Sequence, residues 1–405
     1  MPDHAPAPPH AVAPTERLLS LDVFRGATIA AMLVVNNPGT WGAVYPPLLH
    51  AEWHGWTPTD LIFPFFLFIV GVTTHLSRSA RRVRGDGDPQ LVRQMLRRGG
   101  LIFFWGFILS AFPFFATGAL PDFPDPSFVD RIVWRFEHVR FLGVLQRIGI
   151  AYACGALLTF RTSLKQQVAI VAVLLYGYWF AMTLIPIPGH GIGALQLGSK
   201  GDNLAAHLDR WILGLDHVWS GSRIFDPEGP FSTIPAVGTV MLGVFAGRWI
   251  GGGKPLPERI AGLFAAGFLA TVAGLMWGWA FPINKGLWTS SYALFTAGAG
   301  AATLAACMWI IDQQRVTWWT TPLKVFGVNP LVGFVGSGLM ARLIYSLIQV
   351  ESGGGTVGVQ AVIYRALFAS WLEPRDASLA FALCFTGFWL LVLWALYKRN
   401  IIIRV

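Results

Sequence analysis

The chain has 405 residues, of which 54% are hydrophobic and only 13% are charged, and its formal net charge is +9. Soluble domains carry about a quarter charged residues. This composition therefore excludes an ordinary soluble domain, and the repeated apolar runs of roughly 20 residues predict an all-α, polytopic helical membrane protein. The basic residues lie between the apolar runs, so we interpret them as determinants of topology and expect no nucleic-acid partner.

The chain divides into a short polar tail and one long apolar domain. Residues 1–16 are rich in proline and alanine and are predicted to be disordered. They lack the pattern of a cleavable signal peptide, so the first span is expected to stay as an anchor. Residues 17–405 are expected to form a single transmembrane domain. Its ten predicted spans are 18–36, 57–77, 95–115, 140–160, 167–185, 233–250, 259–281, 289–311, 323–348 and 377–397.

The distribution of arginine and lysine predicts the orientation of these spans. The loop 78–98 holds seven arginines and should be cytoplasmic. With ten spans both termini are cytoplasmic and every cytoplasmic loop is basic. A weaker apolar run at 360–373 is either an eleventh span or a helix on the membrane surface. An eleventh span would place the basic tail at Lys398 outside, so ten is the favoured number.

This topology places four segments on the outer side: 37–56, 116–139, 186–232 and 282–288. The segment 186–232 is long and contains aromatic and charged residues. Loops of this length are functional or disordered, and we expect this one to form an ordered cap.

Several charged side chains lie in or at the ends of apolar spans, among them Asp22, Arg25, Asp60 and Arg147. Asp22 and Arg25 are three residues apart and share a helix face. They form either an interfacial ion pair or a site in which Asp22 holds Arg25 against an anionic group. Arg147 lies in the middle of the fourth span, where a lone guanidinium is costly. It must therefore face a polar cavity or a carboxylate.

The first outer loop contains a candidate general base. His50 lies among aromatic residues that include Trp53, and a neutral imidazole accepts a proton from an amine or a hydroxyl. Asn36 stands where the first helix should end. Its amide either caps the helix or donates to a developing oxyanion.

Two further outer segments carry polar residues. Asp226 and Glu228 flank a proline, and they suit either recognition of an ammonium or sugar hydroxyl, or ordinary turn chemistry. A very short turn opens the eighth span and is expected to line the same cavity; it holds Asn284, Lys285, Trp288 and Ser290. Asn329 precedes a proline and marks a candidate broken helix. The three cysteines are dispersed, and no spacing typical of metal ligands is present, so no metal is predicted.

The motifs SLDVFRG, VNNPG, HAEWHGWTPTDLIFPFFLFIVG, GVLQRIG, FDPEG and PINKGLWTSSY closely resemble the heparan-α-glucosaminide N-acetyltransferase family, and its bacterial members most of all. The similarity runs from Arg17 to the C-terminus. It implies a multi-pass enzyme of the bacterial inner membrane that moves acetyl from cytosolic acetyl-CoA to a terminal amino sugar. One departure is His54, where relatives commonly have asparagine.

The resemblance also implies roles for individual residues. His50 is implied to be catalytic, with Asn36 beside it. The residues expected to hold coenzyme A are Asp22, Arg25, Arg147, Asn284 and Lys285. The residues expected to contact the acceptor are Asp226, Glu228, Trp53, Trp288 and Ser290.

Two other functions stay open at this point: a transporter of amino sugars, and an acyltransferase that modifies hydroxyls of envelope polysaccharide. Free glucosamine, a chitosan fragment and a deacetylated peptidoglycan fragment are all candidate acceptors. An acetyl-histidine route and a ternary complex are both compatible with these residues. Membrane lipids are expected partners, and a homodimer is a further hypothesis.

Overall fold

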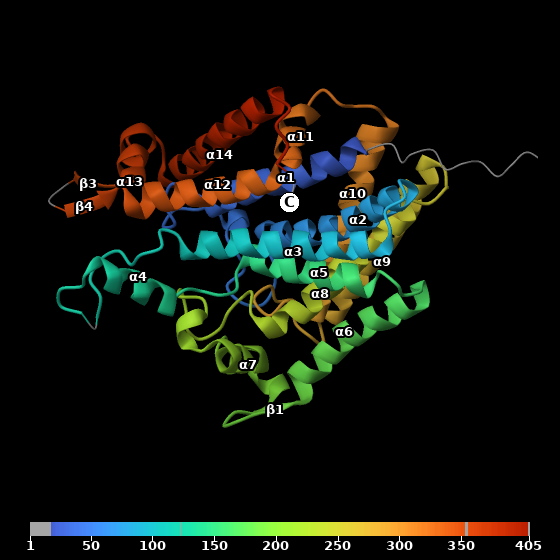
Figure 1. Ribbon diagram of the computed structural model, residues 1–405, viewed down its shortest axis with the longest axis horizontal. Helices are drawn as coiled ribbons and strands as arrows, with labels where there is room; N and C mark the ends of the chain where they lie inside the picture. The colour runs from blue at the N-terminus through green and yellow to red at the C-terminus, as the bar shows by residue number, and fades with distance from the viewer. Residues whose placement is uncertain (1–17, 122, 353–354, 404–405) are drawn as a thin grey trace, which may run out of the picture.

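The computed structural model describes residues 18–121, 123–352 and 355–403. Its regular secondary structure is almost entirely helical (Figure 1), which confirms the predicted helical polytopic membrane fold. The predicted disordered tail, 1–16, lies outside the described residues. The small amount of sheet consists of two antiparallel hairpins, β1 (Pro186–Ile187) with β2 (Gly191–Ile192), and β3 (Gln349–Ser352) with β4 (Gly355–Gly358).

The helices follow one another along the whole chain. In order they are α1 (Leu19–Asn36), α2 (Ile62–Val83), α3 (Asp88–Ala111), α4 (Phe128–Glu137), α5 (Val144–Leu158), α6 (Leu164–Leu184), α7 (Leu204–Leu213), α8 (Pro230–Ile250), α9 (Leu256–Trp277), α10 (Ser290–Cys307), α11 (Thr320–Val328), α12 (Pro330–Arg342), α13 (Val359–Tyr364) and α14 (Pro374–Lys398). A 3₁₀ turn, Pro58–Leu61, leads into α2, and a π-helical segment, Met308–Gln313, extends α10.

Eight helices in the described part of the chain are long and apolar enough to cross a membrane. The third and fourth predicted spans correspond to α3, whose first half is rich in arginine, and to α5, which has only 15 residues. The ninth predicted span is broken, because α11 ends at Val328 and α12 begins at Pro330. Proline removes a backbone donor and clashes with the preceding turn, which explains the break.

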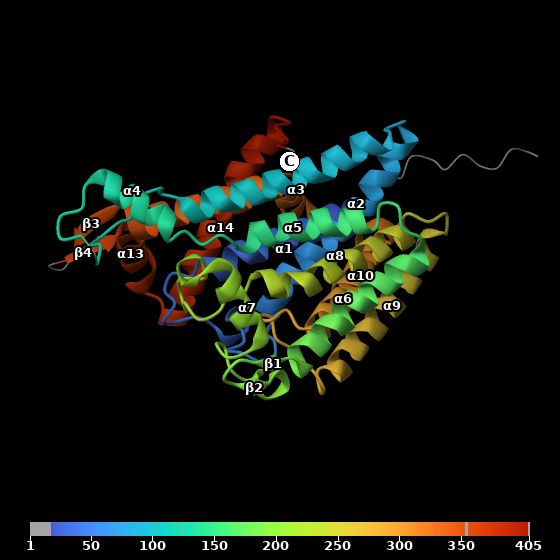
Figure 2. The ribbon, with the colours of Figure 1, turned by 60° about the horizontal axis from the view of Figure 1, so that its bottom comes forward.

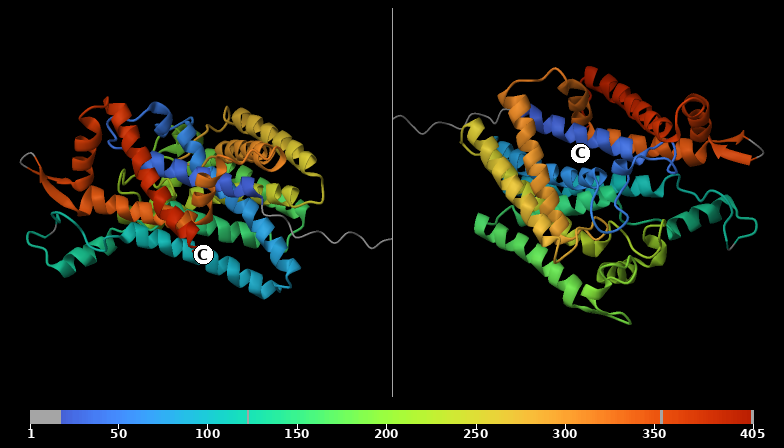
Figure 3. Two further views of the ribbon diagram at one scale, coloured as in Figure 1. Left: turned by 90° about the horizontal axis from the view of Figure 1, so that it is seen from above. Right: turned by 180° about the vertical axis from the view of Figure 1, so that it is seen from behind.

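The long helices run back and forth between two ends of the molecule. The loops 84–87, 159–163 and 251–255 gather at one end, on the right in Figures 1 and 2, and we call this the basic end. The segments 37–57, 185–229 and 278–289 form the opposite end, which we call the capped end. Figure 3 shows α14 lying across α1, the two helices being in contact.

Close helix contacts fix the position of α1 and α2. A Cβ atom at Gly26 of α1 would lie 1.7 Å from the carbonyl oxygen of Leu323 in α11. A Cβ atom at Gly71 of α2 would lie 2.0 Å from the carbonyl oxygen of Val240 in α8. Small residues allow helix backbones in a membrane to approach closely. Neither position has room for a side chain. These contacts therefore fix the positions of α1 and α2, and with them the positions of Arg25 and of the outer loop after α1.

The segment between α6 and α8 folds over the capped end. It contains the β1–β2 hairpin and α7, and it contacts the first outer loop, because the Trp53 indole N–H donates to the Leu197 carbonyl at 2.9 Å. The first outer loop is also tied to the turn before α10. There the N–H of Gly55 donates to the carbonyl of Ile283 at 2.8 Å. Three segments far apart in sequence therefore meet at this end.

Candidate active site

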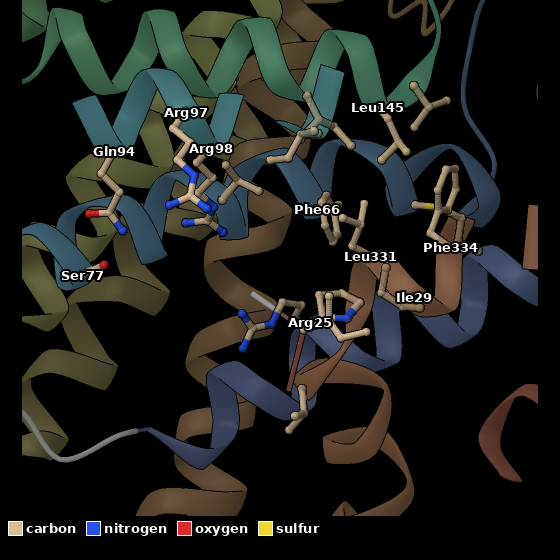
Figure 4. Close-up of a pocket in the computed structure, with 18 of the residues that line it drawn as sticks. Arg25, Ile29, Phe66, Ser77, Gln94, Arg97, Arg98, Leu145, Leu331 and Phe334 are labelled. Carbon is tan, nitrogen blue, oxygen red and sulfur yellow. The ribbon is translucent and has the colours of Figure 1, made fainter. Parts of the chain in front are cut away.

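A cavity of about 540 Å³ lies between α1, α2, α3, α5 and α12. Toward the basic end its lining includes five arginines: Arg25, Arg81, Arg84, Arg97 and Arg98. Figure 4 shows Arg97 and Arg98 extending from one side and Arg25 from the other. Deeper in the bundle the wall is apolar, with Phe66, Leu331 and Phe334. The cavity therefore suits an elongated molecule with an anionic head and a less polar arm.

A second cavity, of about 250 Å³, continues toward the capped end. The two cavities share four lining residues: Met32, Val144, Leu145 and Phe334. The second one is more polar, with Asn36, Gln146 and Arg140 among its lining residues. Asn36 is exposed to this space at the end of α1, where a side-chain amide is available to a ligand. The two cavities therefore lie next to each other, separated by the four shared residues.

At the capped end, His50 is held by two charged partners. Its Nδ1 lies 2.7 Å from Oδ1 of Asp60, and both ring nitrogens lie 3.0 Å from Nζ of Lys285. Asp60 is 1% exposed, and its Oδ2 accepts the N–H groups of Ala51 and Thr57, each at 3.0 Å. A buried carboxylate fixed by backbone donors orients the imidazole and sets its tautomer. The His50 side chain itself is half exposed.

Lys285 connects this group to the rest of the site. Burial lowers the pKa of Lys285, and the carboxylates of Asp60 and Glu228 partly offset that effect. Lys285 Nζ lies 3.7 Å from Asp60 Oδ1. The lysine therefore presents its N–H donors beside the imidazole, within the electrostatic reach of two carboxylates.

A buried ion cluster lies behind the second cavity. Arg140 donates through Nε to Asp226 at 2.9 Å, and its Nη2 lies 2.5 Å from both Asp226 Oδ1 and Glu228 Oε2. Both carboxylates are buried. Burial raises the pKa of Glu228, but the charges of Arg140, Arg147 and Lys285 outweigh this and leave the pKa lowered. Arg140 thus lines the second cavity and also binds Glu228, whose charge acts on Lys285.

Arg147 is fully buried at the capped end. Its Nη2 donates to the hydroxyl of Ser232 and to the carbonyl of Gly229, and its guanidinium lies 5.2 Å from the ring centre of Trp288. Nε and Nη1 have no hydrogen-bond partner among the described residues. Arg147 thus contacts the start of α8, and its expected role in holding coenzyme A stays a prediction.

The turn before α10 is packed more tightly than expected. Asn284 is fully buried; its amide Nδ2–H donates toward His54 Nδ1 at 3.2 Å, and its Oδ1 accepts the N–H of Leu287. Trp288 is also fully buried, and its indole N–H donates to Thr239 Oγ1. Ser290 donates to the Leu175 carbonyl at 2.6 Å. These contacts shape the turn that carries Lys285, and the expected ligand contacts of the three residues stay predictions.

The other predicted residues lie near one of the two cavities or in the cap. Asp22 is 5% exposed and pairs with Arg25, which lines the first cavity. Trp53 is partly buried against Phe225, with ring centres 5.4 Å apart. Trp53 is itself part of the first outer loop, and part of its ring stays accessible.

Sequence reasoning missed three features of the site. Asp60 was noted as a charged residue in an apolar segment, but its contact with His50 was not expected. Arg140 carried no signal, because its partners lie 86 and 88 residues further along the chain. The arginines of the 78–98 loop were explained by topology alone, whereas four of them also line the first cavity.

Asp209 of α7 makes the cap sensitive to pH. The side chain is 1% exposed and accepts the N–H of Phe231 at the start of α8. Burial raises the pKa of Asp209 to about 7, well above the usual ~3.9 of an unfolded chain. Between these values the folded state binds more protons than the unfolded state, so stability falls as the pH rises from about 4 to 7.

We expect Asp209→Asn to remove this loss, because the amide oxygen keeps the hydrogen bond to Phe231 without a charge. In thermal unfolding at pH 8 the variant should melt at a higher temperature than the wild type, and near pH 4 the two should melt alike. Melting curves that stay parallel across this range would show that Asp209 does not titrate as described.

The chain matches one protein-family model and two curated proteins. A family model described as heparan-alpha-glucosaminide N-acetyltransferase, catalytic, matches residues 17–265. The chain is 28% identical over 369 residues to the heparan-alpha-glucosaminide N-acetyltransferase of Mus musculus, covering 79% of this chain and 53% of that protein. It is 29% identical over 371 residues to the Homo sapiens protein of the same name, covering 79% and 52%. The chain spans about half the length of these curated relatives. The matched region includes α1, α2, α3, α5 and the His50 loop but neither α12 nor the turn with Lys285, and the chain belongs to the heparan-alpha-glucosaminide N-acetyltransferase family.

Proposed function

We propose that the protein transfers the acetyl group of cytosolic acetyl-CoA to the amine of glucosamine or of a terminal glucosaminide on the outer side of a bacterial inner membrane. The observation that carries this proposal is the pair of adjacent cavities. One end of the pair holds five arginines, and the other end has a polar wall formed by Asn36 and Arg140. The family named above supplies the reaction class.

The arginines are suited to the charged half of the donor. Guanidinium groups bind phosphates with charge-assisted, often bidentate hydrogen bonds. Arg25, Arg97 and Arg98 face one space (Figure 4), in which the phosphates of coenzyme A would be held. The less polar pantetheine arm would then pass Met32 and Phe334 toward the second cavity.

His50 is suited to act on the acceptor amine. With its Nδ1–H donating to Asp60, the imidazole keeps a lone pair on Nε2; Lys285 Nζ lies 3.0 Å from that atom, and the acceptor amine would take its place there. In the proposed step Nε2 takes a proton as the amine attacks the thioester carbonyl. A C–N bond forms, the C–S bond breaks, and the imidazolium of His50 returns the proton to the leaving thiolate of coenzyme A. A positioned base of this kind contributes ~10²–10⁴-fold to a rate.

Two donors are candidates to stabilise the negative charge that develops on the carbonyl oxygen. Lys285 offers ammonium N–H groups beside His50, and Asn36 offers an amide in the second cavity.

The transfer can pass through an acetyl-histidine or occur directly in a ternary complex. Incubation with acetyl-CoA alone, followed by peptide mass spectrometry, separates these two routes. An acetylated His50 indicates a covalent intermediate, and an unmodified His50 indicates direct attack.

We expect Arg98→Ala to raise the KM for acetyl-CoA about tenfold, since a charge-assisted hydrogen bond contributes ~1.5–3 kcal/mol. The kcat should stay nearly unchanged, because Arg98 lies toward the basic end and His50 lies in the loop at the capped end. Arg93→Ala is the matched control, because Arg93 is on the same helix but outside this cavity. Equal effects of the two substitutions on KM would contradict the assignment.

The proposed function is tested by incubating the purified protein with acetyl-CoA and glucosamine and analysing the products by mass spectrometry. N-acetylglucosamine is the expected product. N-acetylglucosamine offered as the acceptor separates N-transfer from O-transfer, because only an O-acyltransferase modifies it further. Uptake of labelled amino sugar into proteoliposomes without acetyl-CoA would instead favour a transporter.

A further inference from the structure

A third cavity, a groove, lies between the end of α3, the helix α4 and the segment that follows α12. It has a volume of about 270 Å³ and is lined by aromatic residues, among them Phe112, Phe115 and Trp134, and by two arginines, Arg135 and Arg342. Neither the proposed reaction nor the expected residue roles use this groove.

The two arginines carry charges that the described residues do not neutralise. Arg135 donates to the carbonyls of Ser110, Ala111 and Phe112, and Arg342 donates to the carbonyl of Gly338 at 3.2 Å. Neither makes an ion pair with a described residue. Because a guanidinium has five N–H donors, both side chains keep donors for a ligand. Two uncompensated cations at one groove favour an anion.

The helix beside the groove has the pattern of a membrane-surface helix. The side of α4 that packs on the protein carries Arg131, which donates to the carbonyls of Ala116 and Gly118. The opposite side is apolar and exposed: Phe128 is 63% exposed and Val129 is 65% exposed, with Val133 and Phe136 on the same face. An amphipathic helix with such a face lies in the membrane interface with its apolar side among lipid chains.

We propose that this groove binds the phosphate headgroup of an anionic lipid of the outer leaflet. The phosphate would lie between Arg135 and Arg342, and the acyl chains would extend along Phe115 and the apolar face of α4. Binding of a soluble anion would not account for the exposed apolar face of α4. Arg342 also lines the second cavity.

The test measures lipid binding and does not depend on acetyl transfer. Delipidated protein in detergent is titrated with phosphatidylglycerol or with phosphatidylcholine, and bound lipid is counted by native mass spectrometry. We expect phosphatidylglycerol to bind at least tenfold more tightly. Arg342→Gln should weaken that binding on the order of tenfold, the usual size for one charge-assisted hydrogen bond. Arg135→Gln should act similarly.

Arg131→Gln is the matched control, because Arg131 lies one turn before Arg135 and does not line the groove. Arg135 also caps the end of α3, so Arg135→Gln can impair folding. Arg342→Gln then provides the test, because among the described residues Arg342 caps no helix end of this kind. Equal binding of the two lipids, or equal loss in the Arg131 control, would overturn the proposal. Displacement of phosphatidylglycerol by an equal concentration of inorganic phosphate would assign the groove to a soluble anion instead.

Discussion

Replacement of His50 by alanine is expected to lower the kcat for acetyl transfer by ~10²–10⁴-fold while leaving the fold intact. The side chain is half exposed and its main contacts are Asp60 and Lys285, so its removal creates no cavity in the core. The measurement is the rate of N-acetylglucosamine formation at saturating acetyl-CoA. His190→Ala is the control, because His190 lies in the same outer cap and is similarly exposed. A His50→Ala protein with wild-type kcat would falsify the assigned role.

The substitution Asp60→Asn tests the role of His50 in a second way, through the position of the proton on its ring. The amide oxygen of asparagine can still accept the N–H groups of Ala51 and Thr57, but its NH₂ group would face His50 Nδ1. The imidazole would then carry its proton on Nε2, the nitrogen that should accept the proton of the amine. We expect a loss of about 10²-fold in kcat, the scale of a misplaced catalytic group. A KM for acetyl-CoA close to that of the wild type would distinguish this effect from a loss of donor binding.

Replacement of Arg140 by alanine is expected to have the largest effect on stability. It would leave Asp226 and Glu228 buried without their shared cation, and breaking a buried pair in this way costs ~3–5 kcal/mol. The measurement is thermal unfolding in detergent, where the melting temperature should fall by several degrees. Arg161→Ala is the matched control, since Arg161 is 76% exposed and its pair with Asp88 should contribute at most ~1 kcal/mol.

A double variant makes the Arg140 prediction specific. Adding Glu228→Gln to Arg140→Ala removes one of the two uncompensated charges, so part of the lost stability should return. If the double variant is less stable than Arg140→Ala alone, the cost does not come from unpaired carboxylates.

The positions of the spans followed from local properties of the chain. Apolar length located the long helices to within a few residues, as for α1, and the proline after Asn329 located the break between α11 and α12. The break has a further role that no local pattern shows. The Asn329 side chain donates to the carbonyl of Ile401 and accepts the N–H of Ile403, so it holds the C-terminal segment against the first cavity.

The partners of the site residues could not be predicted, because they come from distant segments. The link from Arg140 to Asp226 and Glu228 depends on how α5 and α8 pack, which no spacing encodes. The turn before α10 showed a second limit. Its composition was polar enough for a cavity, but Trp288 and Ser290 point into the core and only Lys285 reaches His50. In a turn this short, the sequence does not determine which side chains face inward.

The central claim, acetyl transfer across a membrane, is tested most directly with sealed proteoliposomes. Acetyl-CoA is trapped inside, glucosamine is added outside, and the external solution is analysed for N-acetylglucosamine by mass spectrometry. The arrangement of the arginine-lined cavity and of His50 at opposite ends predicts external product from the wild type and none from His50→Ala. Product that forms only when both substrates are on the same side would contradict the account.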